Sequence, residues 1–136
     1  MSDKIKSRHL EDEFLQSLYG EHNPQPFGDL LWENASPTSN FAAQTISVDL
    51  NKYNFILVGY AAEASSPNNM QFRILLNDEL KTSYIQYISR LNLSYRKVSI
   101  KAEGISFGSG SRSDYGGNTV VEDLGAVIPF RIYGIK

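Results

Sequence analysis

Only two histidines, His9 and His22, could serve this chain as a general base or as an imidazole ligand. His9 and Glu13 stand four residues apart, a spacing that places two side chains on one face of a helix. Two ligands do not make a zinc site, which needs three or four. A serine hydrolase would need one of these histidines beside its nucleophile, and no G-x-S-x-G elbow occurs. We therefore predict no metal site and no serine hydrolysis.

Carboxylates could act in pairs, as they do in glycoside hydrolases. The candidate acids fall mostly at expected turns and strand ends: Glu63, Asp78, Glu79, Glu103, Asp114, Glu122 and Asp123. Nothing in their spacing selects a pair. The chain has no cysteine, which excludes disulfides, thiolate zinc sites and a cysteine nucleophile. The residues alone select no catalytic set, although paired carboxylates stay possible, and we predict no cofactor.

The stretch GSGSRSDYGG, residues 108–117, could cradle a phosphate, form a binding loop or serve as a hairpin tip. It matches neither G-x-x-x-x-G-K-[ST] nor G-x-G-x-x-G, and no clear helix start follows it. A solvated hairpin tip is the favoured interpretation, and a binding loop is the other. Arg112, Asp114 and Tyr115 are residue types that loops use to contact sugars and proteins, so they are the candidate receptor residues.

The charge and composition of the whole chain narrow the classes of partner that it can bind. The formal net charge is -2 over 136 residues without a basic block, which argues against nucleic acid. No apolar run approaches the ~18 residues of a membrane span, and the charged N-terminus lacks the apolar core of a signal peptide. We expect one soluble domain, made in a reducing cytoplasm.

Residues 3–19 show helical spacing, and 20–29 read as an extended arm with two prolines and two glycines. The apolar residues of the helical segment are Ile5, Leu10, Phe14, Leu15 and Leu18. Leu10, Phe14 and Leu18 form one stripe, which must pack on its own domain or on a partner. We predict that residues 1–29 form a docking or oligomerisation segment.

From residue 30 onward the periodicity is that of strands. The expected strands lie at 43–50, 53–63, 70–77, 84–89, 95–101, 105–107 and 126–136. This spacing predicts a mainly β domain over 30–136, an antiparallel β-sandwich of jelly-roll-like type. Pro129 implies an edge position or a bulge in the last strand. Trp32 is expected to be half-buried against the sandwich.

Three stretches are familiar together: LLWENASPTSNFAAQTISVDLNKYNFILV (30–58), YRKVSIKAEGISFGSG (95–110) and IPFRIYGIK (128–136). They resemble the C-terminal β domain of tail-fibre, head-fibre and baseplate proteins of phages that infect Gram-positive hosts. The resemblance implies a virion protein without enzymatic activity, usually a homotrimer, located in the virion after synthesis in the bacterial cytoplasm. It implies no catalytic residues.

The chain differs from long fibres because only the helical segment and arm precede the β domain. A small spike, a head decoration or a tail-assembly component therefore fits better than a fibre with a shaft. Other virion proteins (capsid, collar or tail) are the expected partners of the N-terminal segment, and a host-surface glycan or protein is the expected partner of the β domain. A free-standing carbohydrate-binding module is the alternative, and a small glycan hydrolase is a third, less favoured one.

Overall fold

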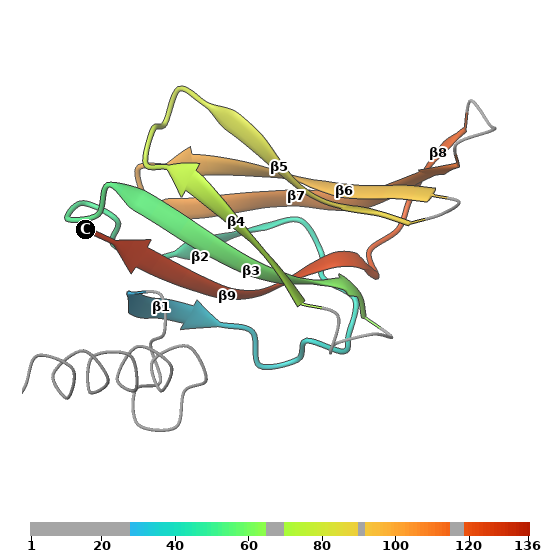
Figure 1. Ribbon diagram of the computed structural model, residues 1–136, viewed down its shortest axis with the longest axis horizontal. Coiled ribbons are helices and arrows are strands. Elements are labelled where there is room, and N and C mark those ends of the chain that lie inside the picture. The colour runs from blue at the N-terminus through green and yellow to red at the C-terminus, as the bar shows by residue number, and fades with distance from the viewer. Residues whose placement is uncertain (1–27, 65–69, 90–91, 115–118) are drawn as a thin grey trace, which may run out of the picture.

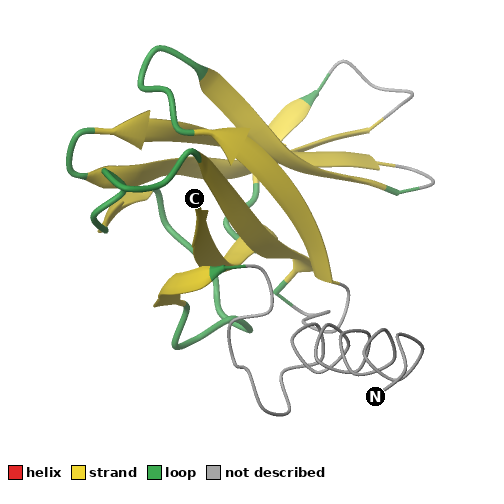
Figure 2. Cartoon of the chain, turned by 60° about the vertical axis from the view of Figure 1, so that its left-hand side comes forward, coloured by secondary structure: helices red, strands yellow, loops and turns green. Residues whose placement is uncertain are grey.

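The computed structural model describes residues 28–64, 70–89, 92–114 and 119–136. Within these ranges the chain forms β-strands and loops and no helix (Figures 1 and 2). The strands are β1 (Asp29–Glu33), β2 (Gln44–Ser47), β3 (Phe55–Glu63), β4 (Met70–Leu76), β5 (Thr82–Ile88), β6 (Asn92–Lys101), β7 (Gly104–Asp114), β8 (Val120–Glu122) and β9 (Ala126–Ile135). The predicted mainly β class is confirmed. The predicted helix, 3–19, and most of the predicted arm lie outside the described residues.

The strands form two antiparallel sheets. Sheet A has the order β1-β9-β3-β4, and sheet B has the order β2-β7-β6-β5, with β8 pairing to β7. Four pairings join neighbours in sequence (β3 with β4, β5 with β6, β6 with β7, β7 with β8). Three others join distant segments (β1 with β9, β3 with β9, β2 with β7). In Figure 1, β5, β6 and β7 of sheet B lie above β9 and β1 of sheet A.

One hydrophobic core draws side chains from both sheets. Ile56 and Val58 of β3 are fully buried on the inner face of sheet A, and Ile85 and Ile105 are fully buried in sheet B. Successive strand residues point to opposite faces, and β2 shows this clearly, with Ile46 buried between exposed neighbours. The alternation predicted for 43–50 is therefore confirmed. Burial of this apolar surface is the main stabilising contribution to such a fold.

The prediction for residues 108–117 is wrong over most of that stretch. Residues 108–114 are not a loop but the second half of β7. Their backbone pairs with β6 on one side and β8 on the other, for example Gly110 opposite Arg96 and Ser113 opposite Val120. Glycine and serine have low strand propensity, but pairing on both sides outweighs it. The remainder of the stretch, 115–118, lies outside the described residues.

Two short strands escaped the sequence analysis, β1 and β8. β1 pairs with β9, and β8 with the end of β7. Pro129 lies in β9, which has neighbours on both sides, so the edge position is wrong. The predicted bulge is confirmed, because the register of β3 against β9 shifts at Gly59 and Tyr60, opposite Pro129. Trp32 is half-buried against the core as expected, edge-to-face with Phe41 at a centroid distance of 6.1 Å.

Candidate binding site

A polar pocket lies where the end of β3, the second half of β7 and the turn before β9 meet. Its volume is about 220 Å³, and its lining is Glu63, Ala64, Ser94, Arg112, Asp123, Gly125 and Ala126. The lining brings one candidate receptor residue, Arg112, together with two of the candidate acids, Glu63 and Asp123. Guanidinium donors and carboxylate acceptors on one concave surface can bind ligands rich in hydroxyl groups.

The turn between β8 and β9 holds Asp123 in the pocket wall. The Gly125 amide donates to Asp123 Oδ1 at 3.0 Å, and the Ala126 amide donates to the Asp123 carbonyl at 3.1 Å. The Asp123 amide in turn donates to the Gly110 carbonyl at 2.8 Å, which ties the turn to β7. Asp123 Oδ2 lies 3.7 Å from Arg112 Nη1. Both side chains keep part of their surface in solvent, so a ligand can reach them.

Beneath this turn lies Arg96, a fully buried arginine of β6. Its guanidinium contacts five backbone carbonyls at hydrogen-bonding distance. Nε donates to Val127 O at 2.9 Å, Nη1 to Phe41 O at 2.9 Å and Gly108 O at 2.7 Å, and Nη2 to Ala126 O at 3.0 Å and Leu124 O at 3.3 Å. An arginine has five N–H donors, so these bonds match its full capacity. Arg96 therefore fastens β7, the segment before β2 and the turn before β9 to one point.

The Arg96 side chain is removed from solvent. Burial lowers the pKa of Arg96 to about 10, and the charge of Asp123 acts in the opposite direction. The Phe41 ring lies 5.3 Å from its Cζ atom and offers a cation–π contact. The guanidinium also holds the carbonyl of Val127, a fully buried residue with a φ of 50°. Positive φ is rare for a β-branched residue and costs on the order of 1–3 kcal/mol, so the surrounding bonds must hold this conformation.

The sequence analysis missed Arg96. In the stretch Tyr-Arg-Lys it reads as one of two exposed charges. One signal was present in the sequence: Arg96, Val98 and Ile100 are spaced two residues apart along β6, and Val98 and Ile100 are buried. A strict period of two therefore places Arg96 on the core face.

The predicted site residues have three different outcomes. Arg112 lies in β7 and lines the pocket. Asp114 ends β7, and its side chain, like all of Tyr115, lies outside the described part of the chain. The docking residues Ile5, Leu10, Phe14, Leu15 and Leu18 lie outside it too.

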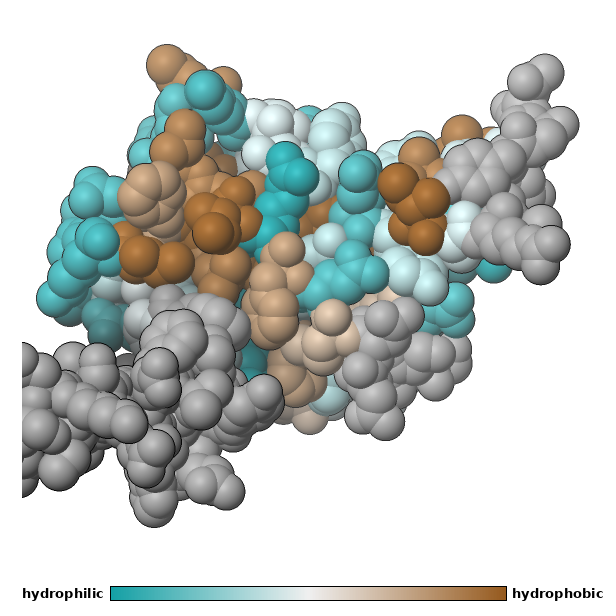
Figure 3. Space-filling view, in the orientation of Figure 1, coloured by the Kyte–Doolittle hydropathy of each residue, from teal (hydrophilic) through white to brown (hydrophobic). Residues whose placement is uncertain are grey.

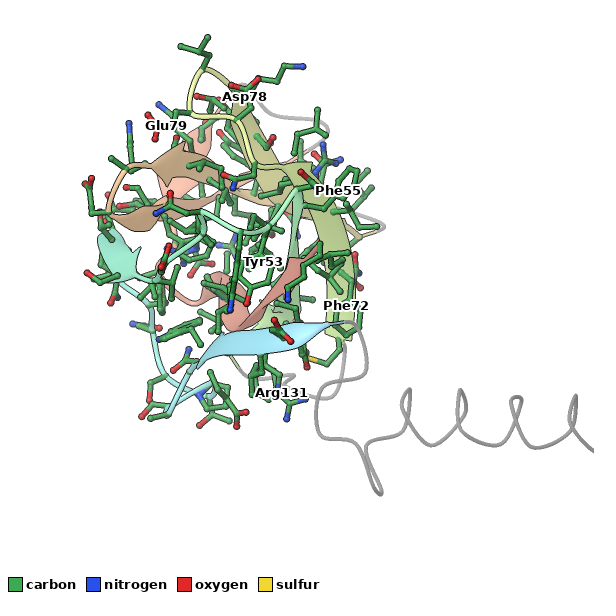
Figure 4. All side chains as sticks on the ribbon, turned by 90° about the vertical axis from the view of Figure 1, so that its left-hand side faces the viewer. Tyr53, Phe55, Phe72, Asp78, Glu79 and Arg131 are labelled. Carbon is green, nitrogen blue, oxygen red and sulfur yellow. The ribbon has the colours of Figure 1, made fainter. Side chains whose placement is uncertain are left out.

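The acids predicted as candidates do not gather in one place. Asp78 and Glu79 lie in the turn between β4 and β5 (Figure 4). Glu103 lies in the turn between β6 and β7, and Glu122 ends β8. Of the six acids whose side chains the structure describes, Glu63 and Asp123 line the pocket. Both carboxylate oxygens of Asp123 already face donors, Gly125 and Arg112, which fits a structural and ligand-contacting role better than acid catalysis.

A second concave surface runs between β4 and β5, the outer strands of the two sheets. It encloses about 610 Å³ and is lined by Tyr60, Gln71, Phe72, Arg73, Ile74, Gln86, Tyr87 and Ile88. Tyr60 crosses between the sheets, since its hydroxyl donates to the Gln86 carbonyl at 2.7 Å. Burial raises the pKa of Tyr60. Its lining mixes polar Gln71 and Gln86 with apolar Phe72, Ile74 and Ile88.

An aromatic pair lies on the outward face of sheet B. Tyr84 of β5 and Tyr95 of β6 meet edge-to-face at 6.1 Å and 76°. Their strand neighbours Ile85 and Arg96 point into the core, so these two rings point away from it. Crossed rings offer a sugar one ring face rather than a flat platform of two.

Within the described ranges, no three acidic or histidine side chains converge to hold a metal ion. The same ranges contain no helix long and apolar enough to cross a membrane. Comparison of the chain with protein-family models, curated proteins and solved structures found no match. The functional argument therefore rests on the residues and on the geometry of the pocket.

Proposed function

We propose that the chain is a phage virion structural protein of the fibre, spike or decoration type. Residues 1–29 dock to other virion proteins (capsid, collar or tail) or join copies into a homotrimer. The β domain faces outward and contacts a host-surface glycan or protein. The protein is made in the bacterial host cytoplasm and ends in the particle.

One observation carries this proposal: two of the three stretches behind the resemblance meet at Arg96, and the third pairs with the first of them. Arg96 and Gly108 belong to 95–110, Phe41 belongs to 30–58, and Val127 directly precedes 128–136. The outer two stretches also pair as β1 and β9, and Asn34 Nδ2 donates to the Pro129 carbonyl at 2.9 Å. The similar residues thus form one connected framework, as expected if the whole domain is shared.

The proposal includes the fold type, an antiparallel β-sandwich of jelly-roll-like type. Two antiparallel sheets over a single core support a β-sandwich. The pairing of β1 with β9 in sheet A and of β2 with β7 in sheet B joins early strands to late ones, as the Greek-key connections of jelly-roll folds do. The hairpins β3–β4 and β5–β6–β7 give this sandwich a strand order of its own.

The virion role is tested on particles. Particles purified by density gradient from cultures that express this chain should contain its peptides by mass spectrometry. Antibody against the β domain should label intact particles, because the domain faces outward. Detection of the chain only in the particle-free cell extract would overturn the proposal.

The host-contact role is tested at the pocket. Arg112→Ala should weaken binding of the purified protein to host cell-wall preparations by roughly tenfold, about 1.4 kcal/mol, because it removes the accessible cation of the pocket. Lys101→Ala is the matched control, an exposed cation at the opposite end of β6. Equal binding by both variants and the parent protein would exclude the pocket as the contact.

The alternative function, a carbohydrate-binding module, is favoured by the Tyr84 and Tyr95 pair. If glycan binding survives Arg112→Ala but is lost in Tyr84→Ala, the glycan binds at the tyrosine pair and not at the pocket. That result would favour the carbohydrate-binding module over a virion protein that contacts its host through the pocket. A glycan hydrolase would depend on Glu63 and Asp123, which line the same pocket. Release of reducing ends from host glycan, abolished in Asp123→Asn, would be needed to support it.

A further inference from the structure

The outward face of sheet A carries an apolar strip, the sheet A strip, made of Phe55, Phe72, Ile74 and Leu76. Phe55 is paired with Leu76 and therefore shares its face, whereas Leu75 points into the core. The four side chains are 39%, 46%, 63% and 52% exposed. Figure 3 shows hydrophobic side chains gathered over β3 and β4, and Figure 4 shows Phe55 and Phe72 projecting to the same side.

This face differs from an ordinary solvated sheet face. An antiparallel sheet with one face in water alternates apolar residues inward and polar residues outward. In β4 the outward positions are Phe72, Ile74 and Leu76. Beside them Leu57 and Tyr133 lie opposite each other on the same face, and both are buried. The exposed apolar patch consists of the four side chains of the strip, and a patch of this kind marks an interaction site.

The chain that precedes the described residues joins the fold beside the sheet A strip. Gly28 lies against the backbone of Gly134 with a φ of 120°, and Asp29 pairs with Gly134. The next residue of β9, Ile135, pairs with Phe55. Residues 1–27 therefore connect to sheet A at the end where the strip begins.

The sequence of that preceding segment supplies a matching apolar surface and enough length. Leu10, Phe14 and Leu18 recur every four residues, the spacing of one helix face. The ten residue steps from Leu18 to Gly28 can span roughly 33 Å. Crossing from β1 to β4 requires only three strand spacings, about 14 Å. The stripe can therefore reach every part of the strip.

We propose that the Leu10, Phe14 and Leu18 stripe of the chain docks on its own sheet A strip in the free protein. The inference does not rest on the virion role, because it concerns the isolated chain. It adds a constraint to that role: the stripe must leave sheet A before it can contact another virion protein. The sheet A strip would then compete with the particle for the same segment.

The test uses the full chain, which has no cysteine and so accepts a single spin label. A nitroxide on Lys81→Cys, beside Ile74 and Leu76, should broaden the amide NMR signals of residues 10–18. The same label on Val120→Cys, in β8, should leave them sharp, because β8 lies far from β4 in Figure 1. A mixture of isotope-labelled chain without nitroxide and unlabelled chain with nitroxide should show no broadening of residues 10–18.

Broadening of residues 10–18 in that mixture would show that the strip holds the segment of a second copy, and would overturn docking within one chain. Equal signals with both label positions would overturn docking altogether. As a second variant, Ile74→Lys in the chain labelled at position 81 should abolish the broadening. Val120→Lys, a matched substitution at a 56% exposed valine, should leave it intact. Strand amide signals that keep their positions show that either variant is folded, and persistent broadening in Ile74→Lys would contradict the proposal.

Discussion

The buried Arg96 holds together the region around the polar pocket and the turn before β9. Arg96 contributes five donors to five carbonyls that come from three separate parts of the chain. A buried charge is normally costly, and here the carbonyl dipoles and the Phe41 ring offset that cost. The arrangement favours one conformation of the turn before β9, in which the carbonyls of Leu124, Ala126 and Val127 all point at the guanidinium.

Removal of this guanidinium should be strongly destabilising. Arg96→Met keeps an apolar stem but leaves five carbonyls without their donor, so we expect a loss of about 3 kcal/mol or more in the free energy of unfolding. Arg96→Lys should recover only part of the lost free energy of unfolding, because an ammonium has three donors. Urea titration followed by circular dichroism measures the free energy of unfolding of both variants.

The matched control is Arg112→Met, which removes a partly exposed arginine from the next strand. Its exposed ion pair contributes little, so the change should stay within ~1 kcal/mol. A similar loss for both arginine variants would contradict the role assigned to Arg96.

Tyr53 gives the molecule an alkaline pH dependence. Its hydroxyl donates to Asp29 Oδ2 at 2.7 Å. This hydrogen bond, then burial and the charges of Asp29 and Asp49, raises the pKa of Tyr53 to about 12. The unfolded chain loses the same proton at about pH 10. The stabilising contribution is therefore fully present below pH 10 and is lost as the pH rises through about 12.

We expect the free energy of unfolding to fall less steeply between about pH 10 and 12 in Tyr53→Phe than in the parent protein. Tyr84→Phe, which changes an exposed tyrosine, should keep the slope of the parent. Denaturant titrations at four pH values across this window provide the slopes. The idea fails if Tyr53→Phe and the parent lose stability in parallel.

At the scale of elements, the packing around β7 explains why a glycine stands at position 110 of the glycine-rich stretch. The turn before β9 packs directly against the backbone of Gly110. A Cβ at this position would overlap the Asp123 carbonyl and lie 2.7 Å from Ala126 O and 2.8 Å from Arg96 Nη2. The glycine is therefore a close-approach residue inside a strand and not a sign of a loop.

Gly110→Ala should consequently destabilise the fold by at least ~2 kcal/mol, since backbone atoms must shift to accept the methyl group. Gly108→Ala is the control in the same strand, where the nearest neighbour of the added Cβ is Lys97 Cβ at 3.3 Å. We expect its effect to stay below ~1 kcal/mol. Thermal unfolding by calorimetry compares the two, and an equal effect at both positions would refute the close-approach argument.

At the scale of the whole molecule, the described residues form a hydrophobic core that bridges both sheets. Among them the buried core cluster runs from Phe41 to Ile132. Deleting residues 1–28 should therefore leave a cooperatively folding domain, which calorimetry would show as a single transition. An unfolded or molten remnant would contradict this division of the chain.

The same deletion should remove assembly if the N-terminal segment mediates it. Light scattering of the full and the shortened chain measures this directly. The virion proposal expects the full chain to incorporate into particles or to form the larger oligomer. Equal oligomers from both chains would assign self-association to the β domain.

The sequence alone determined the mainly β class, the places of most strands and the inward face of residues 43–50, because alternation of apolar residues reports local burial directly. It could not determine that 108–114 is a strand, because pairing with β6 and β8 overrides the weak propensity of glycine and serine. It also missed the function of Arg96, whose partners lie up to 55 residues away in sequence.

Only the tertiary structure brought Glu63, Arg112 and Asp123 to one pocket and the strip residues of β3 and β4 to one face. Pairings such as β1 with β9 join segments at opposite ends of the domain. Side chains from such segments meet because both sheets close over a single core, and no local pattern in the sequence encodes that closure.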